Sequence, residues 1–196
     1  MCMLKISKGE PWLFWPSSIC DTFPTNPSNL LLSGEHSFEF SFDFILRDNS
    51  NVQKTIFTLV PKYTGLDLYK DETVVTITYE DKARYYRLPF SIPVNKHTVV
   101  KFDHKPKFYF KVFINDKEVV NESLEDKVFG INNSPHILIG AGNFPKNNFN
   151  LNFTEFDLLR FTLSQDDKIL ADHFFEERIF DKYVDITGNL NFVHKI

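Results

Sequence analysis

The chain has few cysteines, no excess of basic charge and no long hydrophobic run. Cys2 and Cys20 are its only cysteines among 196 residues. Neither has another ligand at metal-binding spacing, so we expect free thiols rather than a disulfide framework or a zinc site. The formal net charge of −4 offers no attraction to a phosphate backbone, which argues against nucleic acid as a partner. No apolar segment approaches the ~20 residues that span a bilayer, and residues 1–11 lack the apolar run of a signal peptide, so we expect neither membrane insertion nor export.

What the chain does contain is phenylalanine, much of it alternating with polar residues. There are 22 Phe against 7 Tyr and 2 Trp, and a ring without a polar group suits a hydrophobic core better than a sugar-stacking surface. Between residues 37 and 45 every second residue is apolar, as in a β-strand with one buried face. The pattern returns at residues 107–115 and 149–153. The alternating residues are Phe38, Phe40, Phe42 and Phe44, then Phe108, Phe110, Val112 and Ile114, and finally Phe149, Leu151 and Phe153.

Short runs rich in Thr, Val, Ile and Tyr predict further strands, separated by turns at the spacing of an antiparallel sandwich. A chain of this length fits one principal domain. We therefore predict an all-β fold of two antiparallel sheets over residues 37–196, in which residues 165–183 suit either a helix or a strand. The further strand-like runs lie at residues 53–60, 66–70, 73–79, 84–90, 97–103, 137–139 and 149–161, with a closing turn and strand at 185–192.

Residues 1–36 differ in composition from the rest of the chain. Repeated prolines interrupt any regular element, while Trp12 and Trp15 add large apolar rings. We predict an irregular arm whose rings either cover one end of the sandwich or dock on a partner subunit, because Trp is enriched in interface hot spots. Trp12 and Trp15 are therefore candidate binding residues.

Three segments, in order along the chain, resemble the laminin G-like and concanavalin A-like lectin jelly rolls. Residues 37–44 are similar to the early aromatic-rich strand of that fold, and residues 110–119 are similar to its hairpin. Residues 137–140 and 149–164 are similar to its late strands and their exit into a short turn. The resemblance covers about residues 31–164. It implies a two-sheet jelly roll that recognises carbohydrate or protein, sometimes with calcium.

One segment offers an enzymatic alternative. Glu155 and Asp157 match the first two acids of the Glu-x-Asp-x-x-Glu spacing in the laminarinase-type jelly-roll glycoside hydrolases, which this segment resembles. Arg160 stands in place of the third acid, which is the acid/base in that family, and retaining hydrolysis needs two carboxyl groups. We therefore predict no catalytic residues, and place Glu155 and Asp157 on the solvated face of a strand.

Two polar loops could supply oxygen ligands to calcium, a hard cation. One contains Asp48, Asn49 and Asn51, and the other contains the candidate binding residues Asn143, Asn147 and Asn148. No twelve-residue calcium loop is present, and the six histidines show no close pairing for zinc. We expect no metal site and no cofactor, with calcium left open.

A lectin-like fold without an export signal or disulfides fits a virion protein, which is made in the host cytoplasm. We therefore predict a non-enzymatic structural or attachment protein, a phage capsid decoration, fibre or tail component, located in the virion or in the cytoplasm before assembly. Its expected partners are glycan or neighbouring subunits, with a homo-oligomer left open. The alternatives are a jelly-roll glycoside hydrolase and a cytoplasmic protein-interaction module.

Overall fold

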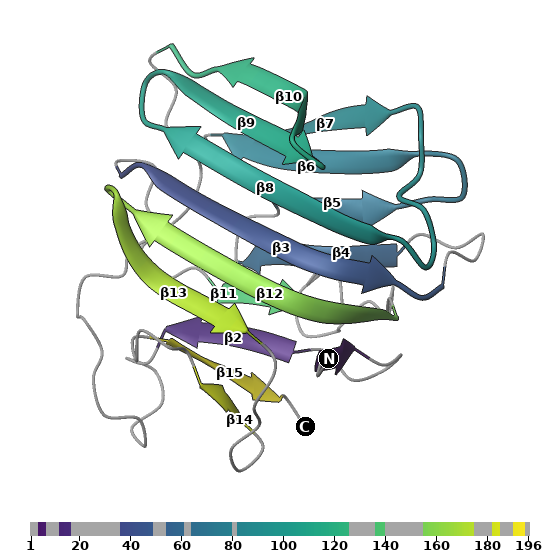
Figure 1. Cartoon of the computed structure of the whole chain (residues 1–196). Coiled ribbons are helices and arrows are strands. Elements are labelled where there is room, and N and C mark those ends of the chain that lie inside the picture. Colours follow the sequence, from purple (N-terminus) through teal and green to yellow (C-terminus); the bar gives the residue numbers. More distant parts are fainter. Residues whose placement is uncertain are drawn as a thin grey trace.

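The computed structural model describes residues 4–6, 12–16, 36–48, 54–60, 64–79, 82–125, 136–139, 155–174, 182–184 and 190–194. Within these residues the regular structure is β-strand, arranged in two antiparallel sheets that pack face to face (Figure 1). No helix in the described segments is long and apolar enough to cross a bilayer. The prediction of an all-β, two-sheet antiparallel fold is confirmed.

Sheet A lies at the front of Figure 1 and carries most of the alternating Phe strands. Its strands are β1 (Leu4–Ile6), β3 (Phe38–Leu46), β8 (His97–Lys105), β9 (Tyr109–Ile114), β10 (Lys117–Ser123), β12 (Phe156–Gln165) and β13 (Lys168–Phe174). Their order is β1-β12-β3-β8-β9-β10. β1 and β13 share the edge of β12 that faces away from β3: β1 pairs with the start of β12, and β13 pairs with the rest. The strands β8, β9 and β10 form local hairpins, whereas β3 and β12 pair across more than 100 residues of sequence.

Sheet B packs against sheet A, and its strands β4 to β7 lie behind sheet A in Figure 1. It combines strands from the N-terminal, middle and C-terminal parts of the chain. Its strands are β2 (Trp12–Pro16), β4 (Lys54–Val60), β5 (Thr64–Leu68), β6 (Thr73–Tyr79), β7 (Lys82–Leu88), β11 (His136–Ile139), β14 (Lys182–Val184) and β15 (Leu190–His194). Their order is β14-β15-β2-β11-β4-β5-β6-β7. The sequence-local meander β4 to β7 forms one half of the sheet, and the other half combines the local β14–β15 pair with the long-range pairs of β2 and β11.

Phenylalanine rings fill the space between the sheets. Phe57 of β4 lies 4.5 Å from Phe42 and 4.9 Å from Phe102, both of sheet A, measured between ring centroids. Phe40 stacks on Phe102 at 4.7 Å, and all four side chains are completely buried. Edge-to-face and offset contacts at these distances are favourable aromatic geometries. The apolar face of the alternating strands therefore points toward sheet B, and their polar face points away from it.

The structure differs from the sequence expectation in the first 36 residues. The expected irregular arm contains two strands, because β1 pairs with β12 and β2 lies between β11 and β15. Pro16 ends β2, a position where a missing N–H is tolerated. The partners of β2 lie over 120 residues away, so no local pattern could indicate that these residues join a sheet. The boundary of a separate arm at residue 36 stays a prediction.

Within the segment 165–183, which suited either a helix or a strand, residues 168–174 form a strand, and residues 175–181 lie outside the described residues. β13 forms a hairpin with β12, and Asp166 and Asp167 between them have φ values of 48° and 63°. Two consecutive residues with positive φ make the tight turn whose twist matches antiparallel strands, and Asp tolerates that conformation better than most residues. The strand predicted at residues 149–153 lies outside the described residues.

Candidate functional site

A cavity of about 300 Å³ opens at one end of sheet A, where β3 and β9 begin, β8 ends and the β12–β13 turn lies. We call it the polar pocket. Its lining is dominated by hydrogen-bonding side chains, with one tyrosine and the edge of the phenylalanine core. The lining residues are Ser37, Phe38, Glu39, Asp103, His104, Tyr109, Ser164, Asp166 and Asp167.

The outward face of sheet A supplies the carboxylates on the floor of the polar pocket. Ser164, Glu39 and Asp103 are direct neighbours across β12, β3 and β8. Each alternates with a buried residue that points toward sheet B, so these three side chains point away from the core. The strand register therefore places a hydroxyl and two carboxylates in one row.

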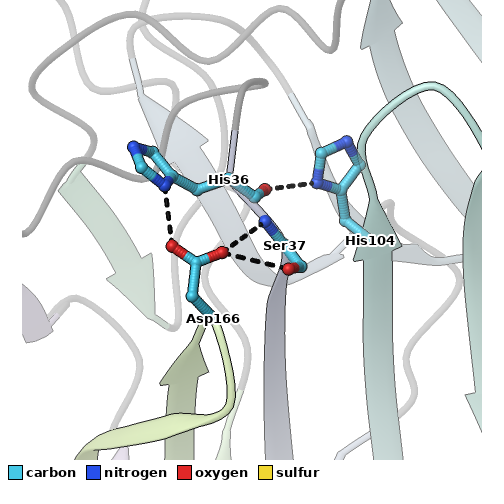
Figure 2. A network of polar contacts seen from close by, with 4 residues as sticks. All are labelled: His36, Ser37, His104 and Asp166. Atoms are coloured by element: carbon cyan, nitrogen blue, oxygen red, sulfur yellow. Dashed lines mark hydrogen bonds and ion pairs between the residues drawn. The ribbon is translucent and has the colours of Figure 1, made fainter.

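The β12–β13 turn forms the wall, and the Asp166 carboxylate ties it to the start of β3 (Figure 2). Oδ1 of Asp166 accepts hydrogen bonds from the backbone N–H and the hydroxyl of Ser37, at 3.1 and 3.0 Å, and Oδ2 lies 2.7 Å from His36 Nδ1. Burial opposes ionisation of Asp166, but the hydrogen bonds from His36 and Ser37 outweigh it and lower the pKa of Asp166. The turn is thus held against β3 by a charged, multiply bonded side chain.

His104 supports the pocket from the core side. Its ring lies 4.6 Å from that of Phe38, and Nδ1–H donates to the backbone carbonyl of His36 at 3.0 Å (Figure 2). Burial lowers the pKa of His104 to about 4, although the bond to His36 opposes this shift. The ring is therefore neutral at pH 7, with its proton on Nδ1, the nitrogen that faces the carbonyl.

Asp103 is the most electrostatically perturbed carboxyl group on the pocket floor. Burial is the largest cause of its raised pKa, and the neighbouring Glu39 charge raises the pKa of Asp103 further. The Tyr109 hydroxyl donates to Asp103 at 3.4 Å, and Lys101 pairs with Glu39 at 3.3 Å. The floor thus joins two acids to a tyrosine that is itself only partly covered.

This arrangement is suited to binding a ligand that donates hydrogen bonds. Carboxylates accept hydrogen bonds, and the hydroxyls of serine and tyrosine accept or donate. The network in Figure 2 is not built for nucleophilic attack, because the Ser37 hydroxyl bonds directly to a carboxylate and not to a histidine that could take its proton. Among the residues that the structure describes, no group of three or more His, Cys, Asp or Glu side chains is arranged to hold a metal ion.

Two of the binding residues predicted from sequence lie in the other sheet. Trp12 and Trp15 are in β2, inside sheet B, whereas the pocket belongs to sheet A. Asn143, Asn147 and Asn148 lie outside the described residues. The binding roles of all five residues stay predictions.

The acidic residues of the hydrolase alternative have separate environments. Asp157 was expected on a solvated strand face, but it is only 4% exposed and accepts a 2.6 Å hydrogen bond from Nε of Arg47. Glu155 is exposed and precedes β12. Arg160, in place of the third acid, donates two 2.8 Å hydrogen bonds to Asp172. Asp157 and Arg160 therefore contribute to ion pairs that join neighbouring segments of sheet A.

In one of the two loops considered for calcium, Asp48 already has a charged partner. Asp48 forms an ion pair with the buried Lys54 at the start of β4. Asn49 and Asn51 lie outside the described residues. Asp48 therefore neutralises a buried ammonium group, and calcium binding at this loop stays untested.

Sequence reasoning missed every residue of the polar pocket. His36 and His104 are 68 residues apart, and Ser37 and Asp166 are 129 apart, so only the pairing of β3 with β8 and β12 brings them together. One signal was present: the pair Asp166-Asp167 stands between two strand-like runs and could have marked a two-residue hairpin turn. Nothing in the sequence alone indicates that this turn contacts the start of β3.

The fold and the pocket define a two-sheet jelly roll with a polar recess at one end of sheet A. Solved structures share this two-sheet architecture. A candidate carbohydrate-binding protein from Bacteroides ovatus superposes with a TM-score of 0.62 at 11% identity, covering 100% of this chain and 59% of that one. The receptor-binding domain of the botulinum neurotoxin C/D mosaic serotype superposes with a TM-score of 0.56 at 18% identity, covering 83% and 39%.

Botulinum neurotoxin type C, which depends on interaction with two ganglioside molecules to enter cells, superposes with a TM-score of 0.50 at 21% identity, covering 67% of this chain and 32% of that one. This chain therefore spans less than two thirds of the length of each of these proteins. No protein-family model and no curated protein matches the sequence. At these identities the likeness establishes the jelly-roll fold, which agrees with the predicted concanavalin A-like architecture.

Proposed function

We propose that the chain is a carbohydrate-binding module that holds a sugar in the polar pocket. The observation that carries this proposal is the row of outward carboxylate and hydroxyl groups beside Tyr109, in a cavity of about 300 Å³. Small-molecule sites commonly occupy ~300–1,000 Å³, so the cavity suits a ligand of one or two sugar units. A sugar presents several hydroxyl donors, which match acceptor oxygens fixed on strands.

The pocket is largely preformed, which favours binding. Glu39, Asp103 and Ser164 project from paired strands, and Asp166 holds the turn through three contacts. A site that is rigid before binding loses less conformational freedom when the ligand arrives. Tyr109 adds an aromatic surface with a polar tip, which suits a ligand that has both C–H faces and hydroxyl groups.

The structural neighbours supply supporting context. One of them is a candidate carbohydrate-binding protein from Bacteroides ovatus. The best-described site in this chain is shaped for binding, and its acidic residues are accounted for without a hydrolytic mechanism. We therefore favour attachment to glycan over glycan cleavage, and the role of this attachment in a phage virion stays a prediction.

A glycan array probed with the purified chain tests the proposal, followed by titration calorimetry with the best-bound glycan. Tyr109→Ala removes the aromatic wall and the hydroxyl that bonds Asp103, so we expect at least about tenfold weaker binding. Tyr85→Ala is the matched control, because Tyr85 is 63% exposed on β7 of the other sheet. Binding of no glycan, or equal losses in the two variants, would contradict the proposal.

A further inference from the structure

We propose that the polar pocket selects sugars that carry no acidic group and rejects sialylated, uronic-acid or sulfated ones. This inference rests on the proposed function and names the class of ligand for the same site. It follows from the charge of the pocket, the engagement of the nearby lysines and the hydrogen-bonding character of the lining.

The lining of the polar pocket is one-sided in charge. Four of its nine residues are Asp or Glu, and none of these nine described residues is Lys or Arg. Glu39 and Asp103 stand side by side on neighbouring strands, and Asp166 and Asp167 occupy the turn beside them. A recess lined by one sign of charge concentrates the electrostatic field of that sign, so the negative potential in the pocket repels an anion.

The lysines on the same outer face are already paired with carboxylates, one of which, Glu39, lies on the pocket floor. Lys101 pairs with Glu39 at 3.3 Å, and its Nζ lies 4.9 Å from the centre of the Phe113 ring. Lys111 pairs with Glu118 of β10 at 3.0 Å and lies 5.0 Å from the Tyr109 ring. A sugar acid in the pocket would have to compete with these carboxylates for either ammonium group.

Ionised carboxylates accept hydrogen bonds but donate none. A neutral sugar meets them with hydroxyl donors, whereas a carboxylate or sulfate brings only further acceptors. Burial first and the Glu39 charge next raise the pKa of Asp103, although Lys101, Tyr109 and Lys111 oppose this shift. An anion placed beside Glu39 and Asp103 would add to the repulsion between these two acids.

The test uses the intact chain on an array that pairs neutral glycans with their sialylated, uronic-acid and sulfated counterparts, followed by calorimetry on the best-bound neutral glycan and its acidic partner. We expect the neutral glycan to bind at least about tenfold more tightly at low salt, because like charges at a binding site are strongly unfavourable. Raising the salt concentration should narrow this preference.

Two charge-neutralising variants locate the origin of the preference. Glu39→Gln removes a charge from the pocket floor and keeps the shape, so the preference should fall about threefold or more. Asp116→Asn removes the same charge from the exposed β9–β10 turn, where Asn also tolerates the φ of 62°, and should leave the preference unchanged.

The outcomes separate the two proposals. Tighter or equal binding of acidic glycans, lost in Tyr109→Ala, would overturn the selectivity and keep the carbohydrate-binding function. An equal change of preference in Glu39→Gln and Asp116→Asn would also overturn it, because the effect would then come from net charge. Binding of no glycan would overturn the function itself.

Discussion

The two faces of sheet A are built from the same strands and follow opposite rules. The inward face of β3 and β8 presents rings such as Phe40 and Phe102, which pack on Phe57 of sheet B. The outward face presents Glu39 and Asp103, which depend on particular partners. Hydrophobic packing is non-directional and collective, whereas each polar contact requires its own donor and acceptor geometry.

This difference separates the residues that stabilise the molecule from those that line the polar pocket. The inward face draws its stability from many interchangeable ring contacts. The outward face contributes little burial, but its exposed, fixed oxygen atoms create the polar pocket. Changes on the two faces should therefore have effects of different size and kind.

The largest expected effect is on the inward face. Phe102→Ala removes a ring that stacks on Phe40 and meets Phe57 and Phe110 edge to face, so the free energy of unfolding should fall by about 3–5 kcal/mol. Urea denaturation followed by circular dichroism measures this change. Phe113→Ala is the control, because Phe113 is only partly buried on the outward face, and it should cost less than about 1 kcal/mol.

If Phe102→Ala does not fold, Phe102→Leu provides a milder substitution that keeps most of the buried volume. It should still cost more than Phe113→Ala. Equal losses at the two positions would show that the inward and outward faces contribute alike, against the comparison drawn above.

The next effect concerns His104, which belongs to the inward face but supports the pocket. Its pKa is about 4 in the folded chain, against 6.5 for the ordinary side chain. Between these values the unfolded chain binds a proton at this position and the folded chain does not, so stability falls as pH drops from 6.5 toward 4. A difference of about 2.5 pKa units corresponds to about 3 kcal/mol at full extent, and above pH 6.5 the contribution vanishes.

His104→Asn keeps a side-chain N–H near the His36 carbonyl and removes the titratable ring. The variant will lose packing at every pH, so the informative quantity is the slope of unfolding free energy against pH, measured by urea denaturation from pH 7.5 to 4. We expect a shallower slope in the variant. Parallel curves, or a His104 ring signal that titrates near 6.5 in the folded protein by NMR, would contradict a buried neutral histidine.

The comparison of the two faces also explains how much the sequence could predict. The inward face was predictable because burial of one strand face requires only apolar residues at every second position, as Phe38 to Phe44 show. The strand before the Asn115-Asp116 turn was predictable for the same local reason. Such signals need no knowledge of which strands become neighbours.

The outward face was not predictable, because its contacts depend on strand register. Glu39 meets Asp103 across 64 residues of sequence only because β3 pairs with β8 in one particular alignment, and a slip of one residue in either strand would turn that strand's carboxylate inward. The same limit hid the pairing of β2 with β11 and β15. Asp157 was misplaced because its buried position depends on Arg47, which is 110 residues away.

The smallest expected effect sharpens the comparison within one short segment, because Glu155 and Asp157 are both acidic and only two residues apart. Asp157→Asn removes the charge that pairs with Arg47, whose side chain is 40% exposed, so the free energy of unfolding should fall by about 2 kcal/mol. Glu155→Gln changes an exposed residue and should stay within about 0.5 kcal/mol of the original. Urea denaturation of both variants at low and high salt measures the difference, and the loss in Asp157→Asn should persist at high salt because the Asp157 carboxylate is buried. Equal, salt-sensitive effects would place Asp157 on the solvated strand face that the sequence predicted. If the unchanged protein cleaves glycan and either variant loses this activity, the hydrolase alternative is restored.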